Sequence, residues 1–212
     1  MAGYCGVAFF ASVLWWAVSM VGKTLLTPEQ YLEIEREAEY KSEYYQGEMR
    51  AMARVSEPHV LIVVNIAAGL HTQLRKRPYF VYMSAMRLAV SAVRLYTYPD
   101  VAVVSGKSQF VDDRRDNLLN PTLIAEVLSP STEAYDRGKK FEHYRHVDSL
   151  REYLLVASES IGAELFTRQP DGHWLLTIAD RLEDTIEIPS IDCRLTLADI
   201  YEKTQLAEPN RT

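Results

Sequence analysis

Two acidic residues lie in sequence contexts that are otherwise apolar. Asp100 follows Tyr98-Pro99 and leads directly into the apolar run 101–104, and Glu126 interrupts the apolar run 123–128. A run of this kind is typical of a strand that is buried on both faces. An ionised carboxylate there loses its hydration and must be paired, protonated or bound to a metal. Glu126 is therefore either a structural residue paired with an arginine or a metal ligand.

The pair of acids suggests which metal could bind. Two carboxylates on neighbouring strands repel one another unless a cation lies between them. A hard divalent ion meets this requirement, and Mg²⁺ typically binds one or two protein carboxylates together with water and substrate phosphate. Asp100 and Glu126 are therefore predicted to hold Mg²⁺ or Mn²⁺.

The segment after Glu126 contains a candidate catalytic cation. A Ser-Pro-Ser-Thr segment ends the strand, and a helix is predicted from about Arg137 to Val147. Lys140 and Tyr144 are four residues apart and share one face of that helix. A lysine at this position can return its ammonium group to the carboxylates and orient a water or stabilise a phosphorane-like transition state. Composition alone favours the alternative that Lys139 and Lys140 form a solvated basic face.

Helix and strand signals predict the elements that position these residues. A capping box with proline at the first helical position begins a helix at Thr27 that runs to about Ala38. Gly47 supplies the positive φ of a tight turn between two strands over 43–49. A second helix begins at Ser56 and ends near Pro78. The other expected elements are strands at 79–83, 87–90, 100–104, 122–128, 152–157, 163–168 and 174–178, and a short helix at 196–203.

Composition favours one α+β domain in a reducing compartment. The chain has 212 residues, of which 48% are apolar, and a chain of this length can bury about 70% of its unfolded surface. The net charge of −6 excludes a globally basic nucleic-acid-binding surface but not a local basic groove. Cys5 and Cys193, the only cysteines, provide neither a disulfide framework nor a CxxC metal site. A cytoplasmic protein is therefore expected.

The N-terminal segment differs from the rest of the chain. Residues 3–21 carry no charge and are numerous enough to span a bilayer, but no Lys or Arg precedes them as in a secretory signal. Residues 1–23 are therefore predicted to be an extension: a leader, a membrane anchor, or a stretch upstream of a true start at Met20. Residues 24–212 are predicted to form a single domain, and only a real anchor at 3–21 would attach it to a membrane.

Several motifs together resemble the Uma-two (Uma2) family, a widespread bacterial family of restriction-like endonucleases within the PD-(D/E)xK nuclease superfamily. The resemblance covers about Leu25 to Lys203. It implies a restriction endonuclease-like fold, with a central mixed β-sheet flanked by helices and metal-binding acids on adjacent strands. In this family pattern Asp100 is the motif aspartate and Glu126 the second motif acid. The matching segments are Glu43 to Gly47, His59, Tyr98 to Val101, Glu126 to Thr132 and Asp136 to Lys140.

One departure from the superfamily pattern affects the catalytic lysine. The usual position, two residues after the acid, is Leu128 here, and Lys140 on the following helix resembles the equivalent residue. Because Lys140 opens a helix, its side chain is expected to need no core partner, so Lys140→Ala should change stability little. Glu43 matches an acid near the first hairpin and is a candidate accessory contact to metal or water. His59 is expected to be a hydrogen-bonding residue at a helix start rather than a ligand.

These residues predict a Mg²⁺- or Mn²⁺-dependent endonuclease that hydrolyses phosphodiester bonds in DNA, with Asp100, Glu126 and Lys140 as catalytic residues. The alternative is an inactive nuclease-fold module that binds nucleic acid or protein, which the acidic net charge favours and the intact acid–lysine set disfavours. No small organic cofactor is expected. A homodimer is expected because cutting both DNA strands usually requires two copies. Candidate phosphate contacts are the basic residues at 75–77, 114–115, 137 and 139.

Overall fold

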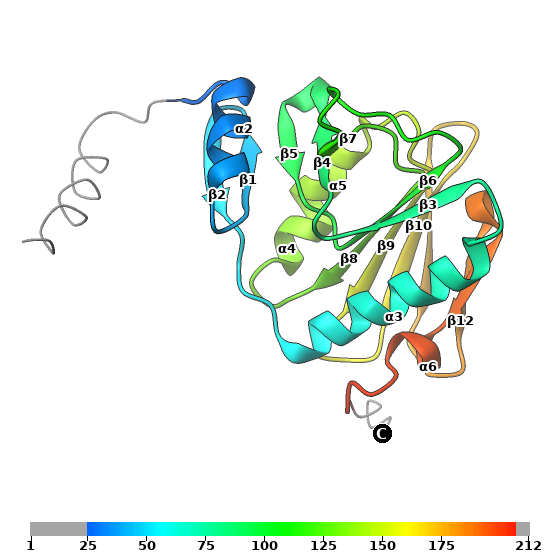
Figure 1. The fold of residues 1–212 in the computed structure, drawn as a ribbon. Coiled ribbons are helices and arrows are strands. Elements are labelled where there is room, and N and C mark those ends of the chain that lie inside the picture. Colours follow the sequence, from blue (N-terminus) through cyan, green and yellow to red (C-terminus); the bar gives the residue numbers. More distant parts are fainter. Residues whose placement is uncertain (1–24, 207–212) are drawn as a thin grey trace, which may run out of the picture.

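A six-stranded mixed sheet forms the centre of the computed structural model, which describes residues 25–206 (Figure 1). Its strand order is β11-β10-β9-β8-β6-β3. The parallel pair β8 and β9 lies between antiparallel neighbours on both sides. The strands are β3 (Tyr79–Met83), β6 (Val101–Ser105), β8 (Leu123–Leu128), β9 (Glu152–Ala157), β10 (Ala163–Arg168) and β11 (Trp174–Ala179).

Strand β8 is central to the site because its side chains alternate between two buried layers. All six of its residues are buried, as its apolar run predicts. Val127 packs in the cluster that includes α3 (Glu57–Leu74), whereas Leu128 packs in a separate cluster around Tyr144. Since alternate side chains share a face, Glu126 points to the same side as Leu128.

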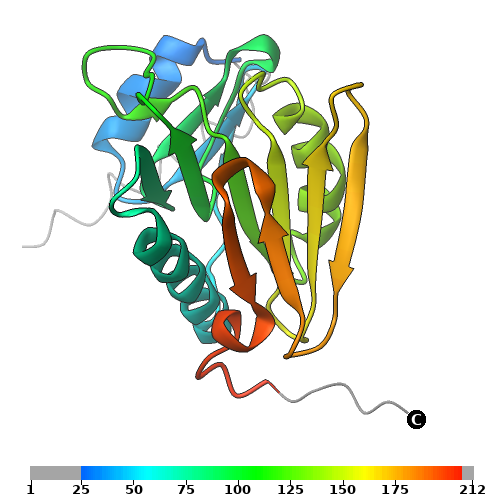
Figure 2. The same ribbon diagram turned by 90° about the vertical axis from the view of Figure 1, so that its right-hand side faces the viewer.

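One face of this sheet is covered by α3 and by a separate two-stranded ribbon, as Figure 2 shows. Helix α3 begins at Ser56, whose side chain accepts a hydrogen bond from the backbone N–H of His59. Its apolar residues recur at helical spacing and face the sheet, as the sequence predicts. The ribbon consists of β12 (Thr185–Ile188) and β13 (Cys193–Thr196), joined by the 3₁₀ turn η3 (Pro189–Ile191), and α6 (Leu197–Ile200) follows it.

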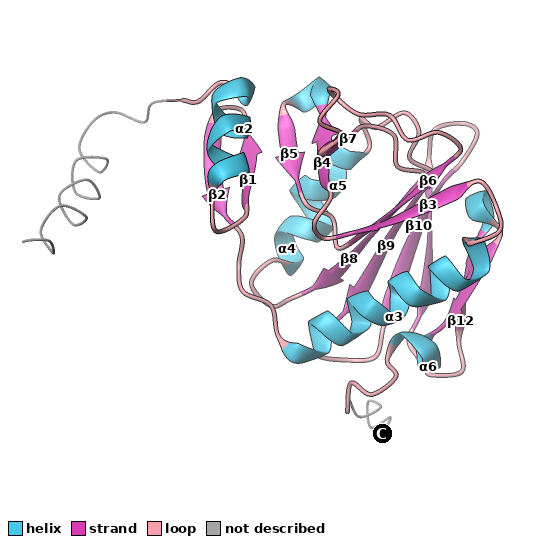
Figure 3. Cartoon of the chain, viewed as in Figure 1, coloured by secondary structure: helices cyan, strands magenta, loops and turns pink. Residues whose placement is uncertain are grey.

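A second sheet, of five strands, lies beside the first, and Figure 3 separates its strands from the helices around it. Helix α2 (Pro28–Glu37) packs against it and carries the predicted capping box at Thr27. Residues 52–56, here called the strap, connect this unit to α3. In the order β2-β1-β5-β4-β7, the strands are β2 (Glu48–Ala51), β1 (Ser42–Tyr45), β5 (Leu95–Thr97), β4 (Arg87–Val90) and β7 (Asn117–Leu118), with the 3₁₀ turn η1 (Ser91–Val93) between β4 and β5.

The prediction of one helix over 137–147 is wrong in the bounds and in the type of helix. The helical segment runs as α4 (Glu133–Tyr135), a π-helical turn η2 (Asp136–Lys140) and α5 (Phe141–Tyr144). It begins earlier because the carbonyl oxygen of Ser129 already accepts the backbone N–H of Glu133. The wider π turn is a local irregularity of the kind that often marks functional sites. The expected helix at 196–203 is also shorter, since only α6 forms there.

The membrane and domain predictions concern the N-terminal segment. Within residues 25–206, no helix is both long and apolar enough to cross a bilayer. The anchor predicted at 3–21 and the domain boundary predicted at residue 24 lie outside the described residues.

The turn between β1 and β2 generates the first testable prediction. Gln46 and Gly47 have φ values of +48° and +99°, as a two-residue hairpin turn with positive φ at both positions requires. A Cβ at Gly47 would lie 2.8 Å from Leu25 Cβ, which cannot move without the backbone. We expect Gly47→Ala to lower the free energy of unfolding by about 1–3 kcal/mol, measured by urea denaturation.

Gly172 supplies the matched control. It has a φ of +87°, but a Cβ there would meet nothing within 4 Å. Gly172→Ala therefore has the backbone strain without the collision and should be the milder change. Equal losses for the two variants would contradict the role assigned to the Leu25 contact.

Candidate active site

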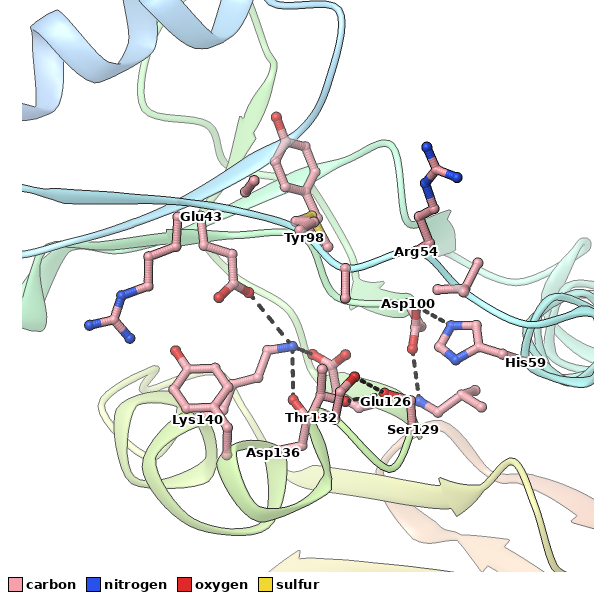
Figure 4. Close-up of a pocket in the computed structure, with 18 residues that line it drawn as sticks. Glu43, Arg54, His59, Tyr98, Asp100, Glu126, Ser129, Thr132, Asp136 and Lys140 are labelled. Atoms are coloured by element: carbon pink, nitrogen blue, oxygen red, sulfur yellow. Dashed lines mark hydrogen bonds and ion pairs between the residues drawn. The ribbon is translucent and has the colours of Figure 1, made fainter. Parts of the chain in front are cut away.

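A cavity of about 300 Å³ opens where the two sheets meet, and Figure 4 shows its labelled side chains. Its lining includes four carboxylates and one ammonium group, from strands β1 and β8, the start of β6 and the turn η2. The strap supplies part of its wall. The charged residues of the lining are Glu43, Asp100, Glu126, Asp136, Lys140, Arg50 and Arg54.

Glu126 is a deeply buried acid of the cavity lining, and two neighbouring side chains stabilise its charge. Its side chain is 3% exposed, and Oε1 accepts a hydrogen bond of 2.8 Å from Tyr144 Oη and lies 2.9 Å from Lys140 Nζ. Burial raises the pKa of Glu126 to about 8, and Lys140 opposes that rise. The two contacts meet on one oxygen, so the carboxylate is held in a single orientation beside the cavity.

Asp100 lies opposite Glu126 because of the strand register. Val101 pairs with Ala125 in the antiparallel β6–β8 ladder, so one step along the ladder brings the two acids side by side. Asp100 Oδ2 accepts the backbone N–H of Val127 at 2.8 Å. The two acids therefore lie side by side, Glu126 on β8 and Asp100 immediately before β6.

His59 holds the other oxygen of Asp100. Its Nε2 lies 3.2 Å from Asp100 Oδ1, and its buried Nδ1 has no hydrogen-bond partner among the described residues. We assign the proton to Nε2, since a proton on Nδ1 would be a buried donor without an acceptor. The structure thus places His59 at the start of α3 as a residue that positions Asp100.

Lys140 is buried, so the expectation that it lies at the surface without core partners is wrong. It is 5% exposed. Its Nζ lies 2.9 Å from Glu126 Oε1, 3.2 Å from Asp136 Oδ1 and 3.8 Å from Glu43 Oε1. The turn η2 places it inside the fold. Burial works to lower the pKa of Lys140, but the nearby acids, Glu126 foremost, outweigh that effect and hold the pKa well above its ordinary value.

Sequence reasoning assigned no role in the site to two residues of this cluster. Asp136 is 3% exposed and pairs with Lys140, and Tyr144 is fully buried against Glu126. The four-residue spacing already noted between Lys140 and Tyr144 extends back to Asp136, and this extended pattern is the signal that could have placed both residues in the site. Glu43 enters the cluster from β1, where the Thr97 hydroxyl donates a hydrogen bond to it.

Three of the seven cations predicted to contact phosphate form ion pairs away from the cavity, and Arg77 is one of them, 3.8 Å from Asp192. Arg137 contacts Glu133 and Glu164, and Lys139 lies 3.0 Å from Glu142. The arginines that line the cavity are instead Arg50 on β2 and Arg54 on the strap. Arg50 also lies 3.0 Å from Glu48 of the same strand. The position of Arg54 depends on the path of the strap, which periodicity does not reveal.

The donor set suits a hard divalent cation. Among the described residues, no group of three or more His, Cys, Asp or Glu side chains is arranged to hold a metal. The carboxylates of Asp100 and Glu126 match the mode in which Mg²⁺ takes one or two protein carboxylates and completes its shell with water and substrate oxygens. The four carboxylates of the lining also exceed its three cationic side chains, Lys140, Arg50 and Arg54, by one, and a bound cation would balance that negative charge.

Three comparisons relate the chain to known proteins. The family model of Uma2, described as "Putative restriction endonuclease", matches residues 28–198. The uncharacterized Synechocystis proteins sll1609 and slr1290 are 37% and 35% identical over 153 and 178 residues, which cover 72% and 83% of this chain and 86% and 91% of theirs.

The fold matches a solved structure. A crystal structure from Anabaena variabilis, titled as a putative nuclease belonging to DUF820, superposes with a TM-score of 0.69 at 16% identity. The match covers 84% of this chain and 99% of that one. It confirms the predicted restriction endonuclease-like fold, in which a central mixed sheet is flanked by helices.

The burial of Lys140 predicts a large effect on stability. Removing one partner of a buried ion pair leaves an uncompensated charge, so Lys140→Ala should lower the free energy of unfolding by about 3–5 kcal/mol. Lys139→Ala is the matched control, since its side chain is 61% exposed, and surface changes usually stay within about 0.5 kcal/mol. Urea denaturation of both variants measures the difference. Equal midpoints would contradict the structural role of Lys140.

Proposed function

The chain belongs to the Uma2 family, and from this premise we propose that it is a divalent-metal-dependent endonuclease that hydrolyses phosphodiester bonds in DNA. The observation that carries the proposal is the convergence of Asp100, Glu126 and the buried Lys140 ammonium group on one cavity. Glu126 lies on β8, Asp100 immediately precedes the neighbouring strand β6, and Lys140 comes from the turn η2 that follows β8. Stability alone does not account for this arrangement, because apolar residues in place of a buried ion pair are often equally or more stabilising.

Asp100 and Glu126 would hold the metal, which we propose to be Mg²⁺ or Mn²⁺. Tyr144 and Lys140 both contact Glu126 Oε1, so Oε2 is the oxygen of this carboxylate that we assign to the metal. When bound, a divalent ion polarises a phosphoryl oxygen and lowers the pKa of a coordinated water.

The protein's own residues would orient the reactants. His59 and the backbone N–H of Val127 hold the Asp100 carboxylate in place before substrate arrives. Lys140 keeps its proton and presents a fixed positive charge near the position where negative charge develops on the phosphoryl group. Glu43, 3.8 Å from Lys140 Nζ, is the candidate to contact an attacking water.

Conservative changes of the two acids test the metal role. We expect Glu126→Gln and Asp100→Asn to lower the rate of Mn²⁺-dependent cleavage by at least about 10²-fold, because each removes one charged ligand of an ion that stabilises the transition state. Cleavage of plasmid, linear and single-stranded DNA measures the rate, and EDTA should abolish it in the wild type. Isothermal titration with Mn²⁺ should show a site that both variants weaken.

Lys139→Ala is the control for this experiment, because its side chain points to Glu142 at the surface. It should keep wild-type cleavage and Mn²⁺ affinity. A wild-type chain that binds Mn²⁺ but cleaves none of the three substrates would overturn the nuclease proposal in favour of a binding module. A Glu126→Gln variant with unchanged cleavage would overturn the assignment of Glu126.

A further inference from the structure

A second cavity, of about 400 Å³, adjoins the first. Asp100, His59 and the strap residues 52–55 line both cavities, so the motif aspartate stands at their junction. The second cavity lies between the strap, the first turns of α3 and the end of β3. A group attached to a phosphate at Asp100 could therefore extend into it.

The lining of the second cavity includes a group of apolar side chains that are open to solvent. Val60 and Val64, one turn apart on α3, are each 46% exposed, and Val55 on the strap is 54% exposed. Met83 at the end of β3 and Tyr40, which is 79% exposed, belong to the same apolar group, and the lining also includes the charged side chains Glu39, Lys41 and Arg54. We call the three valines, Met83 and Tyr40 the valine groove. Exposed apolar side chains gathered beside polar catalytic groups are typical of a ligand-binding site.

An undistorted duplex would not present the faces of its bases to this groove. The side chains of Glu126 and Asp100 are only 3% and 14% exposed. In a duplex the bases are stacked and paired inside the helix, and proteins reach their faces only in single strands or after a nucleotide is extruded. An unpaired nucleotide can turn its base into the groove while its phosphate enters the first cavity.

The charge of the site also favours contacts with bases. Affinity for duplex DNA comes largely from lysines and arginines that neutralise phosphates. The first cavity has four carboxylates against Lys140, Arg50 and Arg54, and the whole chain has a net charge of −6. We therefore expect binding to draw on apolar and stacking contacts, which supply much of the affinity of proteins for single strands, in addition to the few cations that line the two cavities.

We propose that the valine groove binds the unpaired base next to the scissile phosphate, so that the substrate is single-stranded or locally unpaired nucleic acid. This inference rests on the proposed nuclease function. With a single-stranded substrate, cleavage does not require a second copy of the chain, because there is no opposite DNA strand to cut.

Binding of labelled 12-nucleotide strands to the full chain in EDTA tests the proposal by fluorescence anisotropy. The probes are a single strand, its duplex, and an abasic strand with the same number of phosphates. We expect the single strand to bind at least about 10-fold more tightly than the other two, because only it offers free bases. Its log Kd should change with log salt by a slope of only about 1–2, since few cations face the site.

Two groove variants and a control locate the contact. Tyr40→Ser and Val64→Ser should each weaken single-strand binding about 5-fold and leave binding of the abasic strand unchanged. Phe80→Ser is the matched control, because Phe80 is 51% exposed but lines neither cavity. Equal binding of single strand and duplex, an unaltered Tyr40→Ser variant, or binding of no probe would overturn the proposal.

Cleavage with Mn²⁺ separates this inference from the proposed function. Hydrolysis of intact duplex and single strand with equal kcat/KM would overturn the groove assignment and leave the nuclease intact. Base-dependent binding without cleavage of any substrate would overturn the nuclease and leave the groove as a binding site.

Discussion

The buried ion pair between Lys140 and Glu126 is the interaction on which the rest of the site depends. Each charge alone would be costly inside the fold, because burial removes the water that solvates it. Together with Asp136 and Tyr144 they share one polar cluster next to an apolar one, and the ring of Tyr144 belongs to both. The pair therefore links the orientation of Glu126 to the packing of the helical segment against β8. Displacement of that segment would expose an unpaired charge as well as an apolar surface.

The packing around β8 also accounts for the position of Lys140, the lysine that we propose as catalytic, on a segment beyond the strand. Leu128, the usual superfamily position for the lysine, shares a strand face with Glu126 but is 4% exposed among the apolar residues packed around Tyr144. An ammonium group there would have to be buried among Ile124, Leu155 and their neighbours. The π turn η2, which lies across from β8, instead brings the ammonium group of Lys140 to the Glu126 carboxylate. The apolar cluster around Leu128 stays intact.

Periodicity and local composition predict the elements of this site better than their junctions. The buried run of β8, the helical spacing of apolar residues on α3 and the positive φ at Gly47 are properties of short segments. The structure confirms each of them. The depth of Lys140 and the roles of Asp136 and Tyr144 depend on how η2 packs against β8, which no local pattern specifies. Short strands such as β5 and β7 were missed for the same reason, since they are stabilised by partners distant in the chain.

The position of Asp100 follows from the crossing between the two sheets. The chain leaves β5 of the small sheet, passes through Tyr98 and Pro99, and enters β6 of the large one. The hydroxyl of Tyr98 donates to Glu35 of α2 at 2.8 Å and accepts from Arg87 Nε of β4 at 2.9 Å, so buried polar contacts anchor the crossing within the small sheet. On the other side, Val127 and His59 hold the Asp100 carboxylate against the large sheet and α3. The aspartate is thus fixed by both layers at once. Because the same is true of Lys140, which meets Glu43 from one sheet and Glu126 from the other, the cavity keeps its shape only while the two sheets keep their relative position.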